Sequence, residues 1–408
     1  MITSSPPRRR VRSLVKRILV HFLWFTGLLS LAKWWIRRHG AVVLSFHRIL
    51  SREESLETTI QDGMILRDET FAALLRYLRK NHSVIDLANA CHQTQRDRVQ
   101  IALTFDDGWE DNASTALPIA LESKVPLTIF ICPGLMGRSL PFWPEHVSAI
   151  IRSAECAPDG ILKVCRVLTR ACHADWAAEL EQERVDRAGR LIEHLKTVPA
   201  VEREKVLELI FKCEIPIELF VNHKLDRTMS WSQVGHLDKS GVTFGSHTQR
   251  HEILPRIPLA RVEQEIAESK ATIREYLAKD CFLFSYPNGD ASPEVRDVVS
   301  RSGFKLAFIN SPGVWRHNGD PFLIPRINIW ENRVTGSDGQ FSPLAFEYSV
   351  FWRAFIHWRR SRSTTNASTV TGDGAGSVLR PGSVPTLQTD SASLSSVVSN
   401  ERADRIGE

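Results

Sequence analysis

The sequence predicts an α/β domain built around a parallel sheet or barrel. Short apolar runs with strand character alternate with longer stretches of helical periodicity, an order typical of parallel strands joined by helices. The chain has 408 residues and is 43% hydrophobic and 24% charged, so it can bury a large core. Polar residues follow several of the apolar runs, and in such folds the carboxyl ends of the strands carry the functional loops. These observations favour an enzyme domain.

Two stretches have the periodicity of amphipathic helices. They are Ala113–Ser123 and Leu259–Lys279. In the second, Val262, Ile266 and Ile273 fall on one stripe together with Leu277, which is the spacing of a helix with one buried face. Both stretches come shortly after an apolar run, as expected for helices that connect parallel strands.

Two adjacent carboxylates end one apolar run. In the segment 103–108, Leu-Thr-Phe-Asp-Asp-Gly, the run breaks at Asp106 and Asp107. Successive side chains of a strand point to opposite faces, so one Asp can bind a cation while the other accepts a proton. Asp-Gly after an apolar run is also a common turn signal, and the hexapeptide alone leaves both interpretations open.

A pair of histidines is the second candidate feature. His247 and His251 follow the strand-like segment 242–244, and on a helical turn residues four apart lie on one face. Two imidazoles and one carboxylate leave coordination positions free for water and substrate, as in catalytic zinc sites and facial-triad iron sites. Taken alone, a pair at this spacing more often consists of ordinary core or surface histidines.

The third feature is a turn after the apolar run 282–284. The sequence Tyr-Pro-Asn-Gly at 286–289 is a strong turn signal. Such a turn can present a backbone N–H to a developing oxyanion. Alone, it is equally well explained as the plain end of a strand.

Together the three segments resemble the polysaccharide deacetylase family, carbohydrate esterase family 4. The Thr-Phe-Asp-Asp-Gly motif, the Ser-His-Thr-x-x-x-His motif and the Tyr-Pro-x-Gly turn occur in the family's order and spacing. Segments 42–48, 127–131 and 323–328 resemble strands of the family. The resemblance runs from about Val42 to Ile329 with one interruption, and it implies a distorted (β/α) barrel.

The resemblance implies a role for each residue of the first two motifs. Asp107, His247 and His251 would bind a divalent metal, with zinc as the expected ion, although Asp-His-His sites also accept cobalt, nickel or iron. Asp106 would be the general base for a water whose pKa the metal lowers from about 15.7 toward about 7. The reaction implied is hydrolysis of an N-acetyl group on a sugar.

The resemblance also implies roles for residues outside the first two motifs. This chain departs from the family pattern at two of these places. Asn288, Tyr286 and Arg326 are predicted to bind the oxyanion or the substrate. Many members carry an Arg in the third motif that orients the catalytic Asp; Ser285 stands there in this chain, and Arg326 is a candidate substitute. Many also carry a late Leu-x-His whose His is the general acid, and none follows Arg326. In circularly rearranged relatives a His at the end of the first strand resembles that acid, and His47 occupies the matching place, with a structural His as the alternative.

The pattern along the chain predicts four parts. They are a basic amphipathic or membrane-associating helix at 1–39, a deacetylase catalytic domain at 40–340, a basic aromatic helix at 341–362 and a disordered tail at 363–408. Residues 140–228 interrupt the domain with helical stretches at 176–195 and 201–212. This helical insertion either shapes the substrate groove or only packs on the domain. Trp143 and Trp231 are candidate platforms for sugar stacking, or core residues.

The N-terminal segment predicts contact with a membrane surface. Six basic residues within 8–17 precede the apolar stretch 18–32, and basic and Trp residues follow it at 33–38. The stretch is shorter than the ~20 residues that cross a bilayer. No small-x-small cleavage site follows it, so a shallowly inserted helix is favoured over a signal peptide. A helix packed on the barrel is the alternative.

Cysteine usage and charge bear on compartment and partners. The seven cysteines form no Cys-x-x-Cys pair, which predicts free thiols and hence the cytoplasmic face of a membrane, with an extracytoplasmic location left open. The formal net charge of +5 is modest, and no nucleic-acid motif is present, so we expect no nucleic-acid partner. No protein partner is predicted.

The leading prediction is a metal-dependent hydrolase that removes N-acetyl groups from an oligosaccharide or polysaccharide, cleaving a carbon–nitrogen bond other than a peptide bond. One alternative keeps the fold and metal but acts on a non-sugar amide or a cyclic ureide. The other is a non-catalytic saccharide-binding member. The Ser at position 285 and the missing late His are the features that favour this last alternative.

Overall fold

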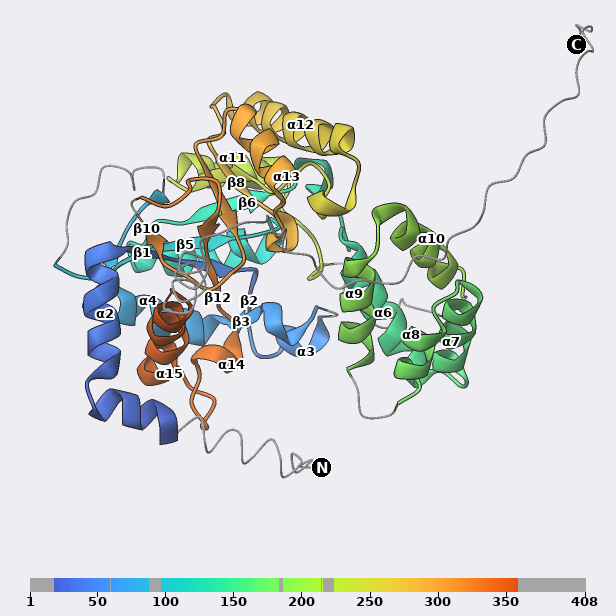
Figure 1. The fold of residues 1–408 in the computed structure, drawn as a ribbon, viewed down its shortest axis with the longest axis horizontal. Coiled ribbons are helices and arrows are strands. Elements are labelled where there is room, and N and C mark those ends of the chain that lie inside the picture. Colours follow the sequence, from blue (N-terminus) through green and yellow to red (C-terminus); the bar gives the residue numbers. More distant parts are fainter. Residues whose placement is uncertain are drawn as a thin grey trace, which may run out of the picture. The chain divides into compact units, whose positions relative to one another are not determined.

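The computed structural model describes most of the chain up to residue 358. The described residues are 18–58, 60–87, 97–182, 186–213, 215, 224–316 and 318–358. The basic residues before 18 and the predicted tail at 363–408 lie outside them. Figure 1 shows a sheet with helices around it and a second group of helices, α6 to α10, drawn in green.

The central sheet is parallel and closes into a ring. Its strands follow the order β1-β5-β6-β7-β8-β9-β11, and β12 pairs back with β1. A single residue, Arg326, separates β11 from β12, so one broken strand pairs with β9 on one side and with β1 on the other. The predicted distorted (β/α) barrel is therefore confirmed. The strands are β1 (Gly40–Phe46), β5 (Gln100–Phe105), β6 (Thr128–Ile131), β7 (Thr243–Ser246), β8 (Leu283–Ser285), β9 (Leu306–Ile309), β11 (Ile324–Pro325) and β12 (Ile327–Asn328).

Shorter strands extend this ring at its margins. The strands β2 and β3 pair in parallel as a separate two-stranded sheet beyond the end of β1. The strand β4 lies beside β5, and β10 runs antiparallel to β1. Their bounds are β2 (Arg48–Leu50), β3 (Ile65–Arg67), β4 (Ser83–Val84) and β10 (Trp315–Arg316).

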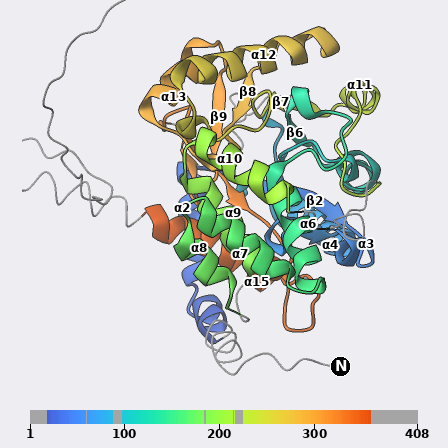
Figure 2. The same cartoon turned by 90° about the vertical axis from the view of Figure 1, so that its right-hand side faces the viewer.

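Amphipathic helices cover the outside of the barrel (Figures 1 and 2). The helix α12 buries Val262, Ile266 and Ile273, which belong to the predicted stripe. The predicted helix at 113–123 is observed as a π-helical turn at Asn112–Ala116 that continues into α5. The helices are α3 (Glu54–Glu57), α4 (Asp68–Asn81), α5 (Leu117–Glu122), α11 (Trp231–Lys239), α12 (Leu259–Leu277), α13 (Pro293–Arg301) and α14 (Glu331–Val334).

The predicted insertion consists of helices with an apolar core of their own. Buried residues of this core include Val147, Leu168, Leu191 and Val206. The predicted helical stretch at 176–195 is divided between two helices, α8 and α9. The side chain of Asp186 accepts a hydrogen bond from the Gly189 N–H at 3.0 Å and so starts a new helix. The helices are α6 (Trp143–Cys156), α7 (Gly160–Arg170), α8 (Ala174–Leu180), α9 (Arg187–Thr197) and α10 (Ala200–Phe211).

The two ends of the described chain pack against each other. The helix α2 (Leu28–His39) contacts the segment formed by α15 (Pro343–Glu347) and the residues after it. The ring of Trp35 lies 3.9 Å from that of Trp358, measured between centroids. Among the described helices none alone has the length and apolar character of a membrane span, whereas Ile18–Phe25 and Leu28–His39, bent by 69°, meet that requirement as a pair.

Candidate active site

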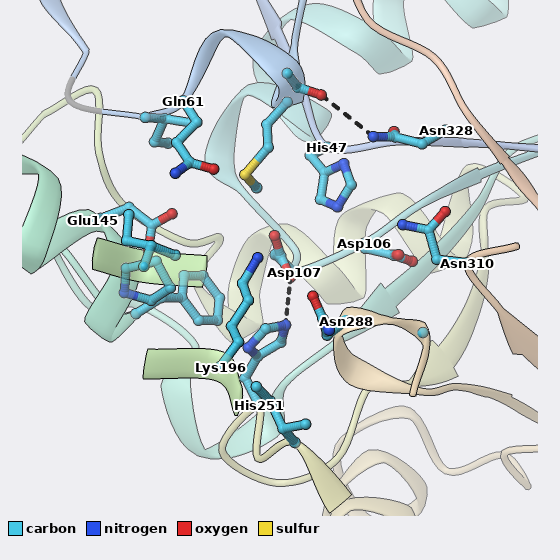
Figure 3. A pocket seen from close by; sticks show the side chains of 18 of the residues that line it. His47, Gln61, Asp106, Asp107, Glu145, Lys196, His251, Asn288, Asn310 and Asn328 are labelled. Atoms are coloured by element: carbon cyan, nitrogen blue, oxygen red, sulfur yellow. Dashed lines mark hydrogen bonds and ion pairs between the residues drawn. The ribbon is translucent and has the colours of Figure 1, made fainter. Parts of the chain in front are cut away.

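The predicted site residues converge on one cavity at the carboxyl ends of the barrel strands. The cavity has a volume of about 230 Å³. Figure 3 shows its polar side chains pointing toward a common centre. The strands that position them follow one another in the ring, which explains how segments far apart in sequence meet. The predicted residues that line it are His47, Asp106, Asp107, His247, His251, Tyr286, Asn288 and Arg326.

Asp107 and the two histidines form a set of metal-binding atoms. The Oδ1 atom of Asp107 lies 3.6 Å from His247 Nε2 and 3.4 Å from His251 Nε2. One potential ligand atom of each residue lies within 4.8 Å of the others. Trp109 Nε1 donates to the other carboxylate oxygen, Oδ2, at 3.0 Å, whereas the buried Oδ1 has no hydrogen-bond partner. A buried, unpartnered carboxylate oxygen facing two imidazole nitrogens fits a divalent cation.

The imidazoles are held in the state that a metal ligand needs. His247 Nδ1 donates to the Ser285 carbonyl oxygen at 2.7 Å, which fixes its proton there and leaves Nε2 free. Burial lowers the pKa of His247 to about 4 and that of His251 to about 3. Both rings are therefore neutral at pH 7, as ligation requires.

The backbone of the histidine motif differs from the prediction. Residues 247–251 form a turn that is not helical. The prediction that His247 and His251 share one face of a helical turn is therefore wrong. Thr248 and His251 have positive φ angles of 65° and 61°, and these bring the imidazoles together. Asp107 is also in the left-handed region, with φ 74°. Such conformations are costly for residues other than Gly and occur mainly at functional sites.

Arg326 holds Asp106 as an ionised carboxylate. Its guanidinium donates to both Asp106 oxygens at 2.7 Å, to the Ser285 hydroxyl at 2.8 Å and to the Thr104 hydroxyl at 3.2 Å. Burial alone would raise the pKa of Asp106, but the charges of Arg326 and His247 lower it well below its usual range. Arg326, at the break between β11 and β12, thus supplies the cation that contacts Asp106. The Ser285 hydroxyl accepts a further hydrogen bond from the same guanidinium. Arg326 is 1% exposed and faces Asp106.

His47 faces the same cavity at the end of β1. Its Nδ1 atom is buried and has no hydrogen-bond partner. The side-chain amide of Asn112 donates to the His47 carbonyl oxygen at 2.9 Å and so fixes the backbone at this position. An imidazole held in place, with a free ring nitrogen, can transfer a proton to a bound substrate.

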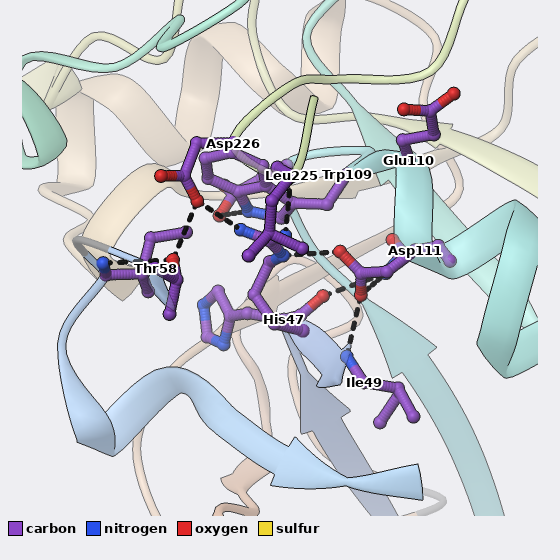
Figure 4. A network of polar contacts seen from close by, with 12 residues as sticks. His47, Ile49, Thr58, Trp109, Glu110, Asp111, Leu225 and Asp226 are labelled. Atoms are coloured by element: carbon purple, nitrogen blue, oxygen red, sulfur yellow. Dashed lines mark hydrogen bonds and ion pairs between the residues drawn. The ribbon is translucent and has the colours of Figure 1, made fainter. Parts of the chain in front are cut away.

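A buried polar network lies beside His47 (Figure 4). Arg48 is fully buried and forms ion pairs with Asp111 and, at 3.4 Å, with Asp226. Its guanidinium also lies over the ring of Trp109, 4.4 Å from the centroid. Because Trp109 donates to Asp107, this network links the end of the insertion to the metal-binding set.

In the Tyr-Pro-Asn-Gly turn, the polar groups of Tyr286 are bonded within the fold, whereas Asn288 projects toward the cavity. The Tyr286 hydroxyl donates to the Phe322 carbonyl at 3.0 Å and its N–H to the Phe308 carbonyl at 3.0 Å, so its polar groups are engaged within the fold. The Gly289 N–H donates to the Tyr286 carbonyl. Asn288, with φ 58°, projects toward the cavity, and its N–H is the remaining candidate donor of the turn.

Trp109, Glu145 and Lys196 are among the residues at the site that went unassigned in the sequence-based prediction. Trp109 follows the Asp motif by two residues, and this proximity was the available signal. Glu145 and Lys196 come from α6 and α9 of the insertion and line the cavity. Pro144 marks the start of α6, but no sequence pattern shows that Glu145 is buried. Of the two candidate stacking platforms, Trp143 lines the cavity, whereas Trp231 stacks on Tyr276 at 3.9 Å.

Comparison with known proteins finds a family model that matches part of the chain. The model of the family "Polysaccharide deacetylase" matches residues 198–307, which include the histidine motif and the Tyr-Pro turn. The deacetylase PplD of Streptococcus pyogenes is 15% identical, with 72% of this chain and 94% of that one covered and a TM-score of 0.45. IcaB from Ammonifex degensii is 17% identical, with 72% and 93% covered and a TM-score of 0.45. No curated protein sequence matches this one.

The fold and the site define an α/β-barrel enzyme with its chemistry at the strand ends. In this chain, residues 198–307 match the model of the polysaccharide deacetylase family. The sequence-based predictions of the family and of the enzyme class, a deacetylase, are confirmed. The roles of the individual site residues stay predictions.

Proposed function

We propose that this protein is a metal-dependent deacetylase that hydrolyses N-acetyl groups on a saccharide. The observation that carries the proposal is the convergence of Asp107, His247 and His251 beside an ionised Asp106. A divalent ion held by the three would act as a Lewis acid toward water and the amide carbonyl, and zinc is the ion we propose. The products are acetate and a free amine on the sugar.

The chain's own residues divide the remaining work. Asp106, kept ionised by Arg326, takes a proton from the attacking water. The backbone N–H of Asn288 faces the developing oxyanion. His47 donates a proton to the nitrogen of the leaving amine, which contributes typically ~10²–10⁴-fold to such a step. Each of these groups lines the cavity that the metal-binding set faces.

Acetate release by the full-length protein tests the proposal. The metal-replete protein should release acetate from N-acetylated oligosaccharides, and Asp106→Asn should lower kcat by about 10²–10⁴-fold with the metal content unchanged. Asp297→Asn is a matched control, because Asp297 is exposed and pairs with Arg296 on the surface. Saccharide binding without acetate release at any metal loading would contradict the proposal.

Two alternatives predicted from the sequence are separated by the same assay. The non-catalytic alternative relied on the Ser at 285, and the Arg326–Asp106 contact supplies the missing cation from another strand. It therefore loses part of its support. A related enzyme acting on non-sugar amides or cyclic ureides would hydrolyse those compounds while leaving N-acetylated saccharides intact.

We also propose that the N-terminal helices attach the enzyme to a membrane surface. The helix Ile18–Phe25 exposes Phe22 to 57%, Trp24 to 61% and Phe25 to 86%. Amphipathic helices with such aromatic faces bind the interface of a bilayer. The cysteines within the described residues are free thiols, which supports the cytoplasmic face.

Vesicle flotation tests this attachment. The full-length protein should float with vesicles that contain anionic lipid, and the Phe22→Ser/Phe25→Ser variant should stay in the soluble fraction. Leu162→Ser, at an exposed position of α7, is the matched control and should float like the unmodified protein. Equal flotation of all three variants would contradict the proposal.

A further inference from the structure

We propose that the helical insertion turns the active site into a pocket for one terminal residue of the saccharide, with Glu145 and Lys196 contacting that sugar. This inference rests on the proposed function, because it names the form of the substrate. It makes the enzyme specific for a chain end and excludes residues in the middle of a polymer. Figure 3 shows Glu145 and Lys196 on the insertion side of the cavity.

Walls on two sides of the cavity carry the first part of the inference. On one side stand the first turn of α6 and the last turn of α9, with Trp143, Glu145 and Lys196. On the other side stands the loop between β2 and β3, with Gln61 and Met64. The cavity volume of about 230 Å³ lies below the range of ~300–1,000 Å³ usual for ligand pockets. This volume is small for the middle of a polymer chain.

Unpartnered polar atoms around the cavity carry the second part. The carboxyl oxygen Oε2 of Glu145 and the amide oxygen Oδ1 of Asn328 are buried and have no hydrogen-bond partner. Glu145 is 4% exposed and yet lines the cavity. Buried polar groups are nearly always paired, and an unpaired one facing a cavity indicates a bonding partner supplied by a ligand. Sugar hydroxyls donate and accept, so they can satisfy both atoms.

Lys196 gives the insertion wall a second polar contact. Its ammonium bonds to Glu193 on the same helix at 2.9 Å and remains partly exposed at the edge of the cavity. Three N–H donors on a flexible stem suit the hydroxyl oxygens of a sugar. Because Glu193 faces solvent, a bound sugar can take over this contact without leaving a buried charge unpaired.

A second cavity gives the remainder of the saccharide a way out. Its volume is about 630 Å³, and it shares Ile60, Gln61 and Ser148 with the first. It runs between the β2–β3 loop and α9, where Arg187 and Arg190 line it. The terminal sugar would occupy the first cavity, and the following units would lie in the second.

The position of deacetylation along an oligosaccharide tests the inference. With N-acetylated oligomers of two to five units, mass spectrometry should find a single free amine, always at the same end. The value of kcat/KM should change less than about 3-fold beyond two or three units. Free amines at internal units, increasing with chain length, would overturn the inference while leaving the proposed deacetylase activity intact.

A binding measurement separates this outcome from a failure of the proposed function. The Asp106→Asn protein should bind an N-acetylated pentamer by calorimetry at least about 10-fold more tightly than the same pentamer blocked at both ends by bulky groups. Equal binding of the two compounds would overturn the inference, whether or not acetate is ever released.

Substitutions in the wall test the named contacts. Glu145→Ala and Lys196→Met should each raise KM about 2- to 10-fold, the value of one hydrogen bond, with kcat changed less. Glu145→Gln keeps a donor and an acceptor and should rescue most of the loss. Glu208→Gln, exposed on α10 of the same insertion, is the matched control. A fall in kcat with KM unchanged would overturn the assigned contacts.

Discussion

Two carboxyl groups face the same cavity from different regions, and their environments push them into opposite states. Asp106 comes from the barrel and accepts two hydrogen bonds from Arg326, so its pKa is lowered. Glu145 comes from the insertion, where burial and the charge of Asp107 raise its pKa to about 8. One is an anion at pH 7 and the other is largely protonated.

The barrel and the insertion prepare their carboxyl groups for different tasks. The barrel pairs its charges internally, as with Arg326 and Asp106, so that the base is ready before any substrate binds. The insertion leaves the Oε2 atom of Glu145 without a partner. A pair of titratable groups held in opposite states is a pattern typical of active sites.

Removing the cation from the barrel should have the largest effect. Arg326→Met leaves Asp106 buried without its partner, so we expect a loss of about 3–5 kcal/mol in the free energy of unfolding at pH 7. Burial would then raise the pKa of Asp106, and the acid limb of the pH–activity profile should move to higher pH. Denaturant unfolding and pH profiles of kcat/KM measure the two effects.

The matched control for this substitution is Arg301→Met. Arg301 is exposed and pairs weakly with Glu263, at 3.8 Å. We expect its stability to change by less than about 1 kcal/mol. If Arg326→Met were as stable as this control, Asp106 would not depend on Arg326, and the contrast between the two carboxyl groups would fail.

The imidazoles of the barrel should make the metal-free protein sensitive to acid. His247 has a pKa of about 4 in the folded state and about 6.5 when unfolded, so the unfolded state binds more protons between these values. Stability is therefore fully present above pH 6.5 and is lost as the pH falls toward 4, by about 3 kcal/mol. Denaturant unfolding in a chelator between pH 4 and 8 measures this loss.

Replacing the imidazole should flatten that dependence. His247→Gln is expected to lose less stability between pH 6.5 and 4 than the unmodified protein does. His236→Gln, at an exposed position of α11, should keep the full dependence. An equal slope in all three proteins would show that burial of His247 does not govern the acid sensitivity.

The contrast between the two carboxyl groups also explains what could be predicted from the sequence. The proposed ligands Asp107, His247 and His251 lie in short motifs at strand ends, so local patterns and the resemblance predicted them together. The partner of Asp106 is 220 residues away along the chain, and only the closure of the ring by the broken strand brings it there. The motifs could name Arg326 as a candidate, but they could not place it.

The burial of Glu145 could not be predicted from the sequence. A Glu in the first turn of a helix is ordinarily exposed and favourable there, so its residue type and position predict a surface role. Its burial depends on how the insertion closes over the strand ends, which no local pattern encodes. The positive φ angles of Thr248 and His251 were missed for a related reason, because tertiary contacts impose a conformation that neither residue type favours.

The last expected effect concerns Glu145 and is a gain in stability. The folded state holds a proton on this carboxyl up to pH 8, whereas the unfolded state releases it above about pH 4.5. Stability is therefore lost as the pH rises from 4.5 to 8. Glu145→Gln is neutral at every pH, so it should be more stable than the unmodified protein by about 4 kcal/mol at pH 7.5 and nearly equal to it near pH 4.5.

Denaturant unfolding at these two pH values measures the gain, with Glu208→Gln as the exposed control. A gain at high pH alone would mean that the insertion keeps an acid whose burial destabilises the fold. Natural proteins retain such residues where a ligand needs them, so the result would tie the instability of this wall to substrate binding. No gain at pH 7.5 would mean that Glu145 is ionised in the folded state, and the two carboxyl groups would then share one environment and not two.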